Sequence, residues 1–290
     1  MQIIRTKTKD GIHYEGILTG DPATSDSIII HIHGMAGSPT LNQYYTEMYK
    51  DYPAAGWHFL AVTHRGTGVA TEFTTDDGAT VLGNAYEKFE DCIHDIEAWV
   101  NKAAEMGYKR IWLQSHSLGP TKVAYYLSQT KDPRIEGAIF ISPSDMVGLI
   151  KSGNESENYK AMISEANDLV KQGKGDQLLS QDIWGLEKLS ADTYLNFFAE
   201  GSNLGVFNYN GPADGWGVVN SLTLPVLAIV GTADVGVVES KNPHEAMKQL
   251  EGELKNSPRV KTIVYEGADH SFDGFGGRIV EDVLEFVNQS

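Results

Sequence analysis

RIWLQSHSLGPTKVAYYL, residues 110–127, is the stretch of sequence that decides the fold. It begins with a short apolar run, 110–114, which predicts a buried strand, and residues 120–129 continue in a helical pattern. Between them lie Ser115, His116, Ser117, Leu118 and Gly119. The stretch therefore predicts a strand, a tight turn and a helix in direct succession, which is the repeating unit of an α/β sheet.

The same alternation extends in both directions from this stretch. Residues 11–18 alternate like an early antiparallel strand, and further helical patterns occur at 85–106, 244–254 and 278–288. Strands and helices that alternate in this way predict an α/β fold with a mostly parallel, doubly wound sheet. The other short apolar runs bounded by turn residues are 28–33, 57–63, 136–141, 225–230 and 260–265.

One segment, 145–216, breaks the alternation. It is polar and helical at first and then rich in aromatic residues, Asn and Gly. We expect it to be an inserted helical cap on the edge of the sheet. The predicted organisation is a core in two parts, 1–144 and 217–290, with the cap insertion at 145–216 between them.

The composition sets limits on the partners. The chain has 290 residues, of which 41% are hydrophobic and 21% charged, and this balance is ordinary for a globular protein. The net charge of −16 creates a field that repels phosphate backbones and anionic lipid, so we expect neither a nucleic acid nor a membrane partner. Solubility explains this charge, with an attraction for cationic substrates as the alternative. The oligomeric state is left open.

The location is predicted from two features. Cys92 is the sole cysteine and has no second thiol in the chain to pair with, so nothing indicates an oxidising compartment. The first residues lack the apolar core of a signal peptide, and no window reaches the length of a membrane span. We therefore expect a cytoplasmic protein.

Ser117 is the candidate nucleophile. A serine that attacks a substrate needs a sharp, strained turn between strand and helix, with small residues two positions before and after it. Ser115 and Gly119 meet that requirement, and the helix that follows directs its positive end towards the reaction centre. The alternative is an ordinary turn whose serine caps the helix.

A base and an acid follow in the order that such a nucleophile requires. His270 lies in GADHSF, 267–272, after the last predicted strand, and Asp234 lies in LAIVGTADVGV, 227–237, after the strand before it. Histidine suits proton transfer near neutral pH, and a carboxylate at its Nδ1–H fixes the tautomer. Asp145 is the alternative acid. Asp269 and Asp273 lie too near His270 in sequence to be its usual partner.

The segment HIHGMAGSP, 31–39, is the candidate oxyanion loop. Its donors are expected to be the backbone N–H groups of Met35 and of Leu118, the residue after the nucleophile. Gly34 and Gly37 allow the loop to approach a substrate closely. A glycine-rich turn without a catalytic part is the alternative, and His33 is a candidate to support the loop by hydrogen bonding.

The motifs HGMAGS, SHSLG, GTAD and GADHSF together resemble the serine α/β-hydrolases, from about residue 11 to 288. Residues 63–73, THRGTGVATEF, resemble the R-G-x-G loop of esterase- and lipase-like members, and residues 28–150 more loosely resemble the siderophore-esterase-like branch. This sequence departs from the pattern in having Ser115 where Gly is usual, Pro120 after Gly119, and Asp269 before the histidine.

The resemblance implies the α/β-hydrolase fold and cleavage of a carboxylic ester of a small or medium-sized molecule through an acyl-enzyme on Ser117. The sequence holds no Cys/His cluster of metal-ligand spacing and no phosphate loop, so neither a metal nor a cofactor is expected. Alternatives on the same triad are acyltransferase, thioesterase, C–C hydrolase and lyase activity, and a non-catalytic ligand receptor. The expected substrate-binding residues come from the cap aromatics, above all Trp184, Phe198 and Phe207, with Tyr194, Phe197, Tyr209 and Trp216 as further candidates.

Overall fold

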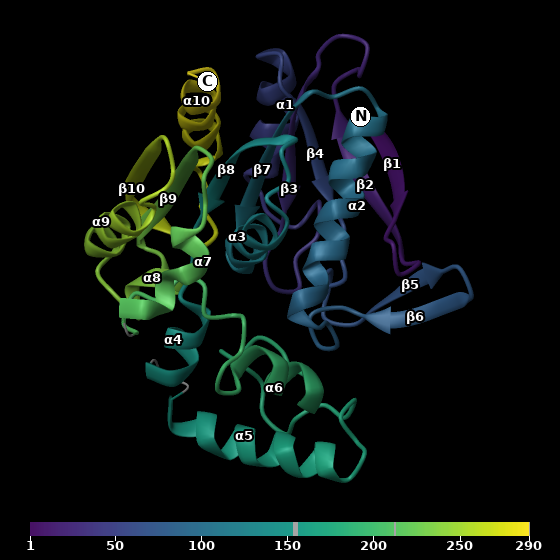
Figure 1. The fold of residues 1–290 in the computed structure, drawn as a ribbon, viewed down its shortest axis with the longest axis vertical. Helices are drawn as coiled ribbons and strands as arrows, with labels where there is room; N and C mark the ends of the chain where they lie inside the picture. Colours follow the sequence, from purple (N-terminus) through teal and green to yellow (C-terminus); the bar gives the residue numbers. More distant parts are fainter. Residues whose placement is uncertain (153–155, 212, 290) are drawn as a thin grey trace.

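The computed structural model describes residues 1–152, 156–211 and 213–289, and its centre is an eight-stranded sheet (Figure 1). The strands lie in the order β1-β2-β4-β3-β7-β8-β9-β10. β1 and β2 pair antiparallel, as do β2 and β4, and every neighbouring pair from β4 to β10 is parallel. The strands are β1 (Gln2–Lys7), β2 (His13–Thr19), β3 (Ser27–Ile32), β4 (His58–Val62), β7 (Arg110–His116), β8 (Ile135–Ile141), β9 (Val226–Ala233) and β10 (Val260–Asp269).

This arrangement confirms the predicted α/β-hydrolase architecture. β3 pairs with β4 on one side and with β7 on the other, so the chain order reverses there. Ligands of such sheets bind where the order reverses, beyond the carboxyl ends of the strands. The segments that follow β3 and β7 are therefore the first place to look for a site.

Helices cover both faces of the sheet (Figure 1). α1 and α10 contact each other on one face, and α2 and α3 do so on the other. Side chains on neighbouring positions of a strand point to opposite faces, and Trp112 and Leu113 of β7 accordingly belong to different hydrophobic clusters. The bounds are α1 (Tyr45–Ala54), α2 (Cys92–Glu105), α3 (Leu118–Thr130), α9 (Pro243–Glu253) and α10 (Gly276–Val287).

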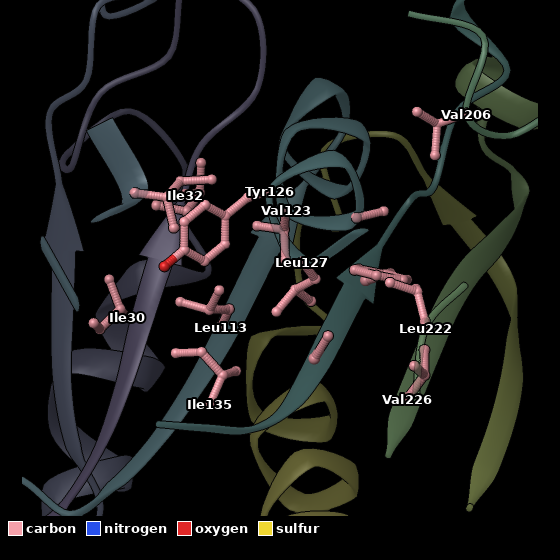
Figure 2. Packing of buried hydrophobic residues seen from close by; sticks show 14 of the residues in the cluster. Ile30, Ile32, Leu113, Val123, Tyr126, Leu127, Ile135, Val206, Leu222 and Val226 are labelled. Carbon is pink, nitrogen blue, oxygen red and sulfur yellow. The ribbon is translucent and has the colours of Figure 1, made fainter. Parts of the chain in front are cut away.

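The cluster beneath α3 is seen from close by in Figure 2. Val123 and Leu127 of α3 pack over Leu113 of β7 and Ile135 of β8, and all four are buried. Burial of such side chains stabilises the fold by roughly 1.5–3 kcal/mol each, so this contact fixes the helix on the strands. The position of the turn at Ser117, between β7 and α3, is fixed with it.

Some elements have no counterpart in the sequence prediction. β1 is an edge strand with mostly exposed side chains, so it carries no apolar alternation. The hairpin of β5 (Thr71–Thr75) and β6 (Gly78–Leu82) forms a small separate sheet. The predicted helix 85–106 begins later, as η1 (Phe89–Asp91) followed by α2. Three further short helices are η2 (Ala213–Trp216), α7 (Gly217–Asn220) and α8 (Val235–Val238).

The helical insertion contains α4 (Met146–Ser152), α5 (Ser156–Lys171) and α6 (Ala191–Phe198), with α5 and α6 at the lower end of Figure 1. It is held to the core by hydrogen bonds, including Phe89 N to Asn196 Oδ1 (2.8 Å) and Ser190 N to Ala85 O (2.9 Å). A hydrophobic cluster joins Cys92 and Leu118 of the core to Phe197 of the insertion. We propose 145–216 as the bounds of this cap.

None of the described helices is both long enough and apolar enough to cross a bilayer.

Candidate active site

Ser117 lies in the turn between the end of β7 and the start of α3, with φ +60° and ψ −112°. A serine rarely adopts such angles, and surrounding contacts must hold it there. Its amide donates to the carbonyl of Ile141 at 3.1 Å. Gly119 is required because a Cβ there would lie 2.4 Å from the Ile32 carbonyl oxygen. Ser115, which stands where Gly is usual, fits because its hydroxyl donates to the Ile139 carbonyl at 3.2 Å.

The structure brings the three predicted polar residues into one hydrogen-bonded chain. His270 Nδ1 lies 2.7 Å from Asp234 Oδ1, and His270 Nε2 lies 2.9 Å from Ser117 Oγ. A carboxylate only accepts hydrogen bonds, so Nδ1 carries the ring proton and Nε2 offers its lone pair to the Ser117 hydroxyl. This is the geometry in which an imidazole can remove the proton of a serine.

Asp234 is buried and caps α8, where its Oδ1 accepts from the amide of Gly236 at 2.9 Å. Burial by itself raises the pKa of this carboxyl, but the hydrogen bond and charge of His270 outweigh burial and leave the pKa below its ordinary value. Asp234 is therefore charged at neutral pH, as a partner of a protonated histidine must be.

The competing acids are engaged elsewhere. Asp145 accepts hydrogen bonds from the amides of Gly148 (2.7 Å) and Tyr209 (3.0 Å). Asp269 accepts from the amides of Ser271 and Phe272 in the turn after β10. The geometry therefore favours Asp234 as the partner of His270.

The loop after β3 lies directly against Ser117. A Cβ on Gly34 would approach the Ser117 Cβ to 2.7 Å, so only glycine allows this contact. His33 Nδ1–H donates to the Gly34 carbonyl at 2.8 Å, and its Nε2 accepts from the Thr67 hydroxyl at 2.8 Å. Burial lowers the pKa of His33 to about 3, which keeps the ring neutral. His33 thus supports the loop through hydrogen bonds at both ring nitrogens.

The two predicted oxyanion donors come from the two segments that meet at Ser117, the loop after β3 and the start of α3. Met35 follows Gly34 in the loop and lines the pocket, while Leu118 is the first residue of α3. The roles of their amides remain a proposal.

Arg65 of the R-G-x-G segment stabilises the structure rather than lining the pocket. Its side chain is almost fully buried and forms ion pairs with Asp95 (2.8 Å), Asp10 (3.2 Å) and Asp91 (3.2 Å). These contacts hold the loop after β4 against α2. Arg65 does not line the pocket next to Ser117.

A pocket of about 660 Å³ opens over Ser117 and His270. That volume suits a small or medium-sized organic molecule. Apolar side chains form much of its wall, and no lysine or arginine belongs to the described residues that line it. Its apolar lining residues are Met35, Leu41, Met146, Leu149, Trp184, Leu186 and Val235.

The cap aromatics that were expected to bind substrate differ in their position relative to the pocket. Trp184 lines the pocket, but Phe198 and Phe207 do not, and the expectation for these two is corrected. Phe198 packs edge-on beneath Trp184 with ring centroids 6.2 Å apart, and Phe207 packs against Phe140 at the sheet. Both are fully buried and serve packing. Tyr194, Phe197, Tyr209 and Trp216 are also buried away from the pocket.

Several pocket residues were not predicted. Leu41, Leu149 and Leu186 belong to no motif, because an apolar residue in a loop looks the same whether it faces a pocket or the core. Ser142 does not line the pocket but is a further unpredicted residue of the site: its Oγ lies 3.0 Å from His270 Nδ1, and its one signal in the sequence was its place at the end of β8. Among the residues that the structure describes, no group of three or more His, Cys, Asp or Glu is arranged to hold a metal ion.

Comparisons with known proteins identify the family of the chain. A family model described as serine aminopeptidase, S33, matches residues 23–273. Phospholipase YtpA of Bacillus subtilis (strain 168) is 25% identical over 117 residues, a match that spans only 40% of this chain and 40% of that protein.

Solved structures resemble the whole chain. Est1E from Butyrivibrio proteoclasticus, with ferulic acid bound, has a TM-score of 0.68 at 20% identity and covers 98% of each chain. A monoglyceride lipase variant from Saccharomyces cerevisiae has a TM-score of 0.66 at 15% identity, covering 98% of this chain and 94% of that one. At these identities the likeness describes the fold.

Proposed function

Because the chain belongs to the serine aminopeptidase S33 family and is a serine hydrolase of the α/β-hydrolase fold, we propose that it cleaves carboxylic esters through an acyl-enzyme on Ser117. The observation that carries this proposal is the hydrogen-bonded chain Ser117–His270–Asp234 at the mouth of an apolar pocket. The resemblance of the chain to a monoglyceride lipase, and to Est1E with its bound ferulic acid, adds support.

The proposed mechanism follows from the geometry. His270 Nε2 takes the hydroxyl proton as Ser117 Oγ attacks the ester carbonyl, and Asp234 stabilises the imidazolium that forms. The amides of Met35 and Leu118 donate to the oxyanion. The imidazolium returns the proton to the departing alcohol. Water, activated by the same histidine, then releases the carboxylic acid.

The proposed substrate is an uncharged ester with an apolar acyl or aryl group. An anionic group would find no lysine or arginine among the described lining residues, and it would meet the exposed Glu239 at the wall. The net charge of −16 acts against it as well. The apolar side chains and flexible methionines of the pocket wall suit a substrate whose hydrocarbon group varies in shape.

The test compares the protein with its Ser117→Ala variant on uncharged p-nitrophenyl esters. We expect the variant to lose at least about 10⁴-fold in kcat while its circular dichroism and unfolding curve stay unchanged. A fluorophosphonate probe should label Ser117 in the unmodified protein, as mapped by peptide mass spectrometry. Turnover retained in Ser117→Ala would contradict the proposal. Thioester, amide and lyase substrates in the same panel distinguish ester cleavage from other reactions of this fold.

A further inference from the structure

A third side chain lies beside the proton that His270 shares with Asp234. Ser142 follows β8 directly, and its Oγ is 3.0 Å from His270 Nδ1. Nδ1 is at the same time 2.7 Å from Asp234 Oδ1. Two oxygens from different strands therefore approach one ring N–H.

The backbone holds Ser142 in this position at a cost. Its φ is +52°, in the left-handed region that a serine rarely adopts. The amide donates to the Ile229 carbonyl of β9 at 2.8 Å, and the side chain is fully buried. Strained residues persist where the surroundings fix them, and they gather at active sites.

The Ser142 hydroxyl has one hydrogen-bond partner as an acceptor and another as a donor. Its oxygen is an acceptor for Nδ1–H, beside the Asp234 carboxylate. Its proton has an acceptor in Ser144, whose Oγ lies 3.4 Å from Ser142 Oγ. The Ser144 oxygen can accept this hydrogen bond because the Ser144 hydroxyl itself donates to the Ser142 carbonyl at 3.2 Å.

We propose that Ser142 is a positioning residue, whose hydroxyl oxygen accepts from His270 Nδ1–H beside Asp234 and holds the imidazole in the orientation that presents Nε2 to Ser117. This inference rests on the proposed function of the triad. When His270 becomes an imidazolium, the charged Nδ1–H has two oxygen acceptors. Ser142 thus acts mainly when that charge forms, so its loss affects kcat and leaves KM unchanged.

Two variants separate the hydroxyl from the backbone strain. Ser142→Ala removes the hydroxyl and keeps an L side chain at φ +52°, whereas Ser142→Gly removes the hydroxyl and relieves the strain. We expect both to lower kcat about tenfold, the size expected for one hydrogen bond, with KM within twofold. The glycine variant should unfold at a temperature no lower than the alanine variant. The rate of fluorophosphonate labelling should fall in parallel with kcat.

The matched control is Ser240→Ala. Ser240 is a buried serine just beyond α8 whose hydroxyl donates to the Val237 carbonyl at 2.9 Å, and it does not line the pocket. We expect its kcat to equal that of the unmodified protein within twofold.

The possible outcomes are distinct. A kcat that recovers in Ser142→Gly would show that only the backbone matters, and a kcat within twofold in both variants would show that the hydroxyl does nothing; either result overturns the positioning role. If the unmodified protein turns over ester and Ser117→Ala does not, the proposed function stands whatever Ser142 does. Retained turnover in Ser117→Ala removes the basis of both proposals.

Discussion

Lys122 Nζ lies 2.6 Å from Glu87 Oε2, and both side chains are fully enclosed by protein. Lys122 belongs to α3, one turn after the nucleophile, while Glu87 precedes η1. Burial raises the pKa of Glu87, and the charge of Lys122 offsets part of that rise. Because both side chains are shielded from water, the charge of Lys122 and the charge of Glu87 are each stabilised mainly by the other.

The first prediction concerns this pair. Lys122→Met leaves Glu87 buried without its partner, and we expect it to lower the free energy of unfolding by about 3–5 kcal/mol. The double variant Lys122→Met/Glu87→Leu removes both charges and should recover most of that loss. Urea unfolding of the three proteins measures this. Equal destabilisation in the single and double variants would show that packing, not charge, explains the effect.

The second prediction concerns Asp234. Asp234→Asn replaces an obligate acceptor by an amide that favours the wrong histidine tautomer, and we expect kcat to fall about 10⁴-fold. Asp145→Asn is the control, because Asp145 accepts hydrogen bonds from backbone amides and does not contact His270 by any described hydrogen bond. It should change stability far more than kcat. Steady-state kinetics on one uncharged ester decides between these two acids.

The third prediction separates a pocket aromatic from a packing aromatic. Trp184→Ala opens the pocket wall, so KM for an aryl or long-chain ester should rise more than KM for an acetyl ester. Phe207→Ala leaves a cavity at the sheet and should cost about 3–5 kcal/mol of unfolding free energy without changing the ratio of the two KM values. A ratio that changes in Phe207→Ala would contradict its assignment to packing.

The fourth prediction is a pH dependence at the junction of cap and core. Glu187 is buried, accepts from Asn84 Nδ2 at 2.7 Å, and has its pKa raised to about 7, first by burial and then by the nearby Glu87. A carboxyl whose pKa is raised in the folded protein binds protons more strongly there than in the unfolded chain. Stability therefore falls as the pH rises from the ordinary glutamate pKa towards 7.

The variant Glu187→Gln keeps the shape and removes this titration. We expect it to be more stable than the unmodified protein at pH 8, with the difference vanishing near pH 5. Thermal unfolding of both proteins across this range is the measurement. A stability difference that does not depend on pH would refute the role of Glu187 ionisation.

Much of the fold and site was predictable because the chemistry restricts residue types at strand ends. The short apolar runs at 110–114 and 225–230, bounded by turn residues, predicted buried strands, and the order Ser117, Asp234, His270 then predicted that all three side chains lie at one edge. The distances between these side chains could not be predicted from the sequence, because they depend on how β8, β9 and β10 pair.

Other features of the structure left weaker signals in the sequence. Phe198 and Phe207 were misplaced because aromatic composition does not tell a pocket wall from a packed interior. α1 was missed although Tyr45, Met48 and Tyr52 are buried at helical spacing, a signal that the Pro53 in its last turn obscures. Ser142 has no motif, and its contact with His270 exists only after three strands have assembled.

The sole cysteine allows local opening of this protein to be measured by a chemical reaction. Cys92 is buried in the cluster shared by core and cap, and burial raises the pKa of its thiol well above the ordinary value. A thiol reagent reaches Cys92 only when the packing around it opens, so the rate of its alkylation under native conditions measures how often that opening occurs. Ligands that stabilise this packing should slow the alkylation, which offers a ligand screen that requires no turnover.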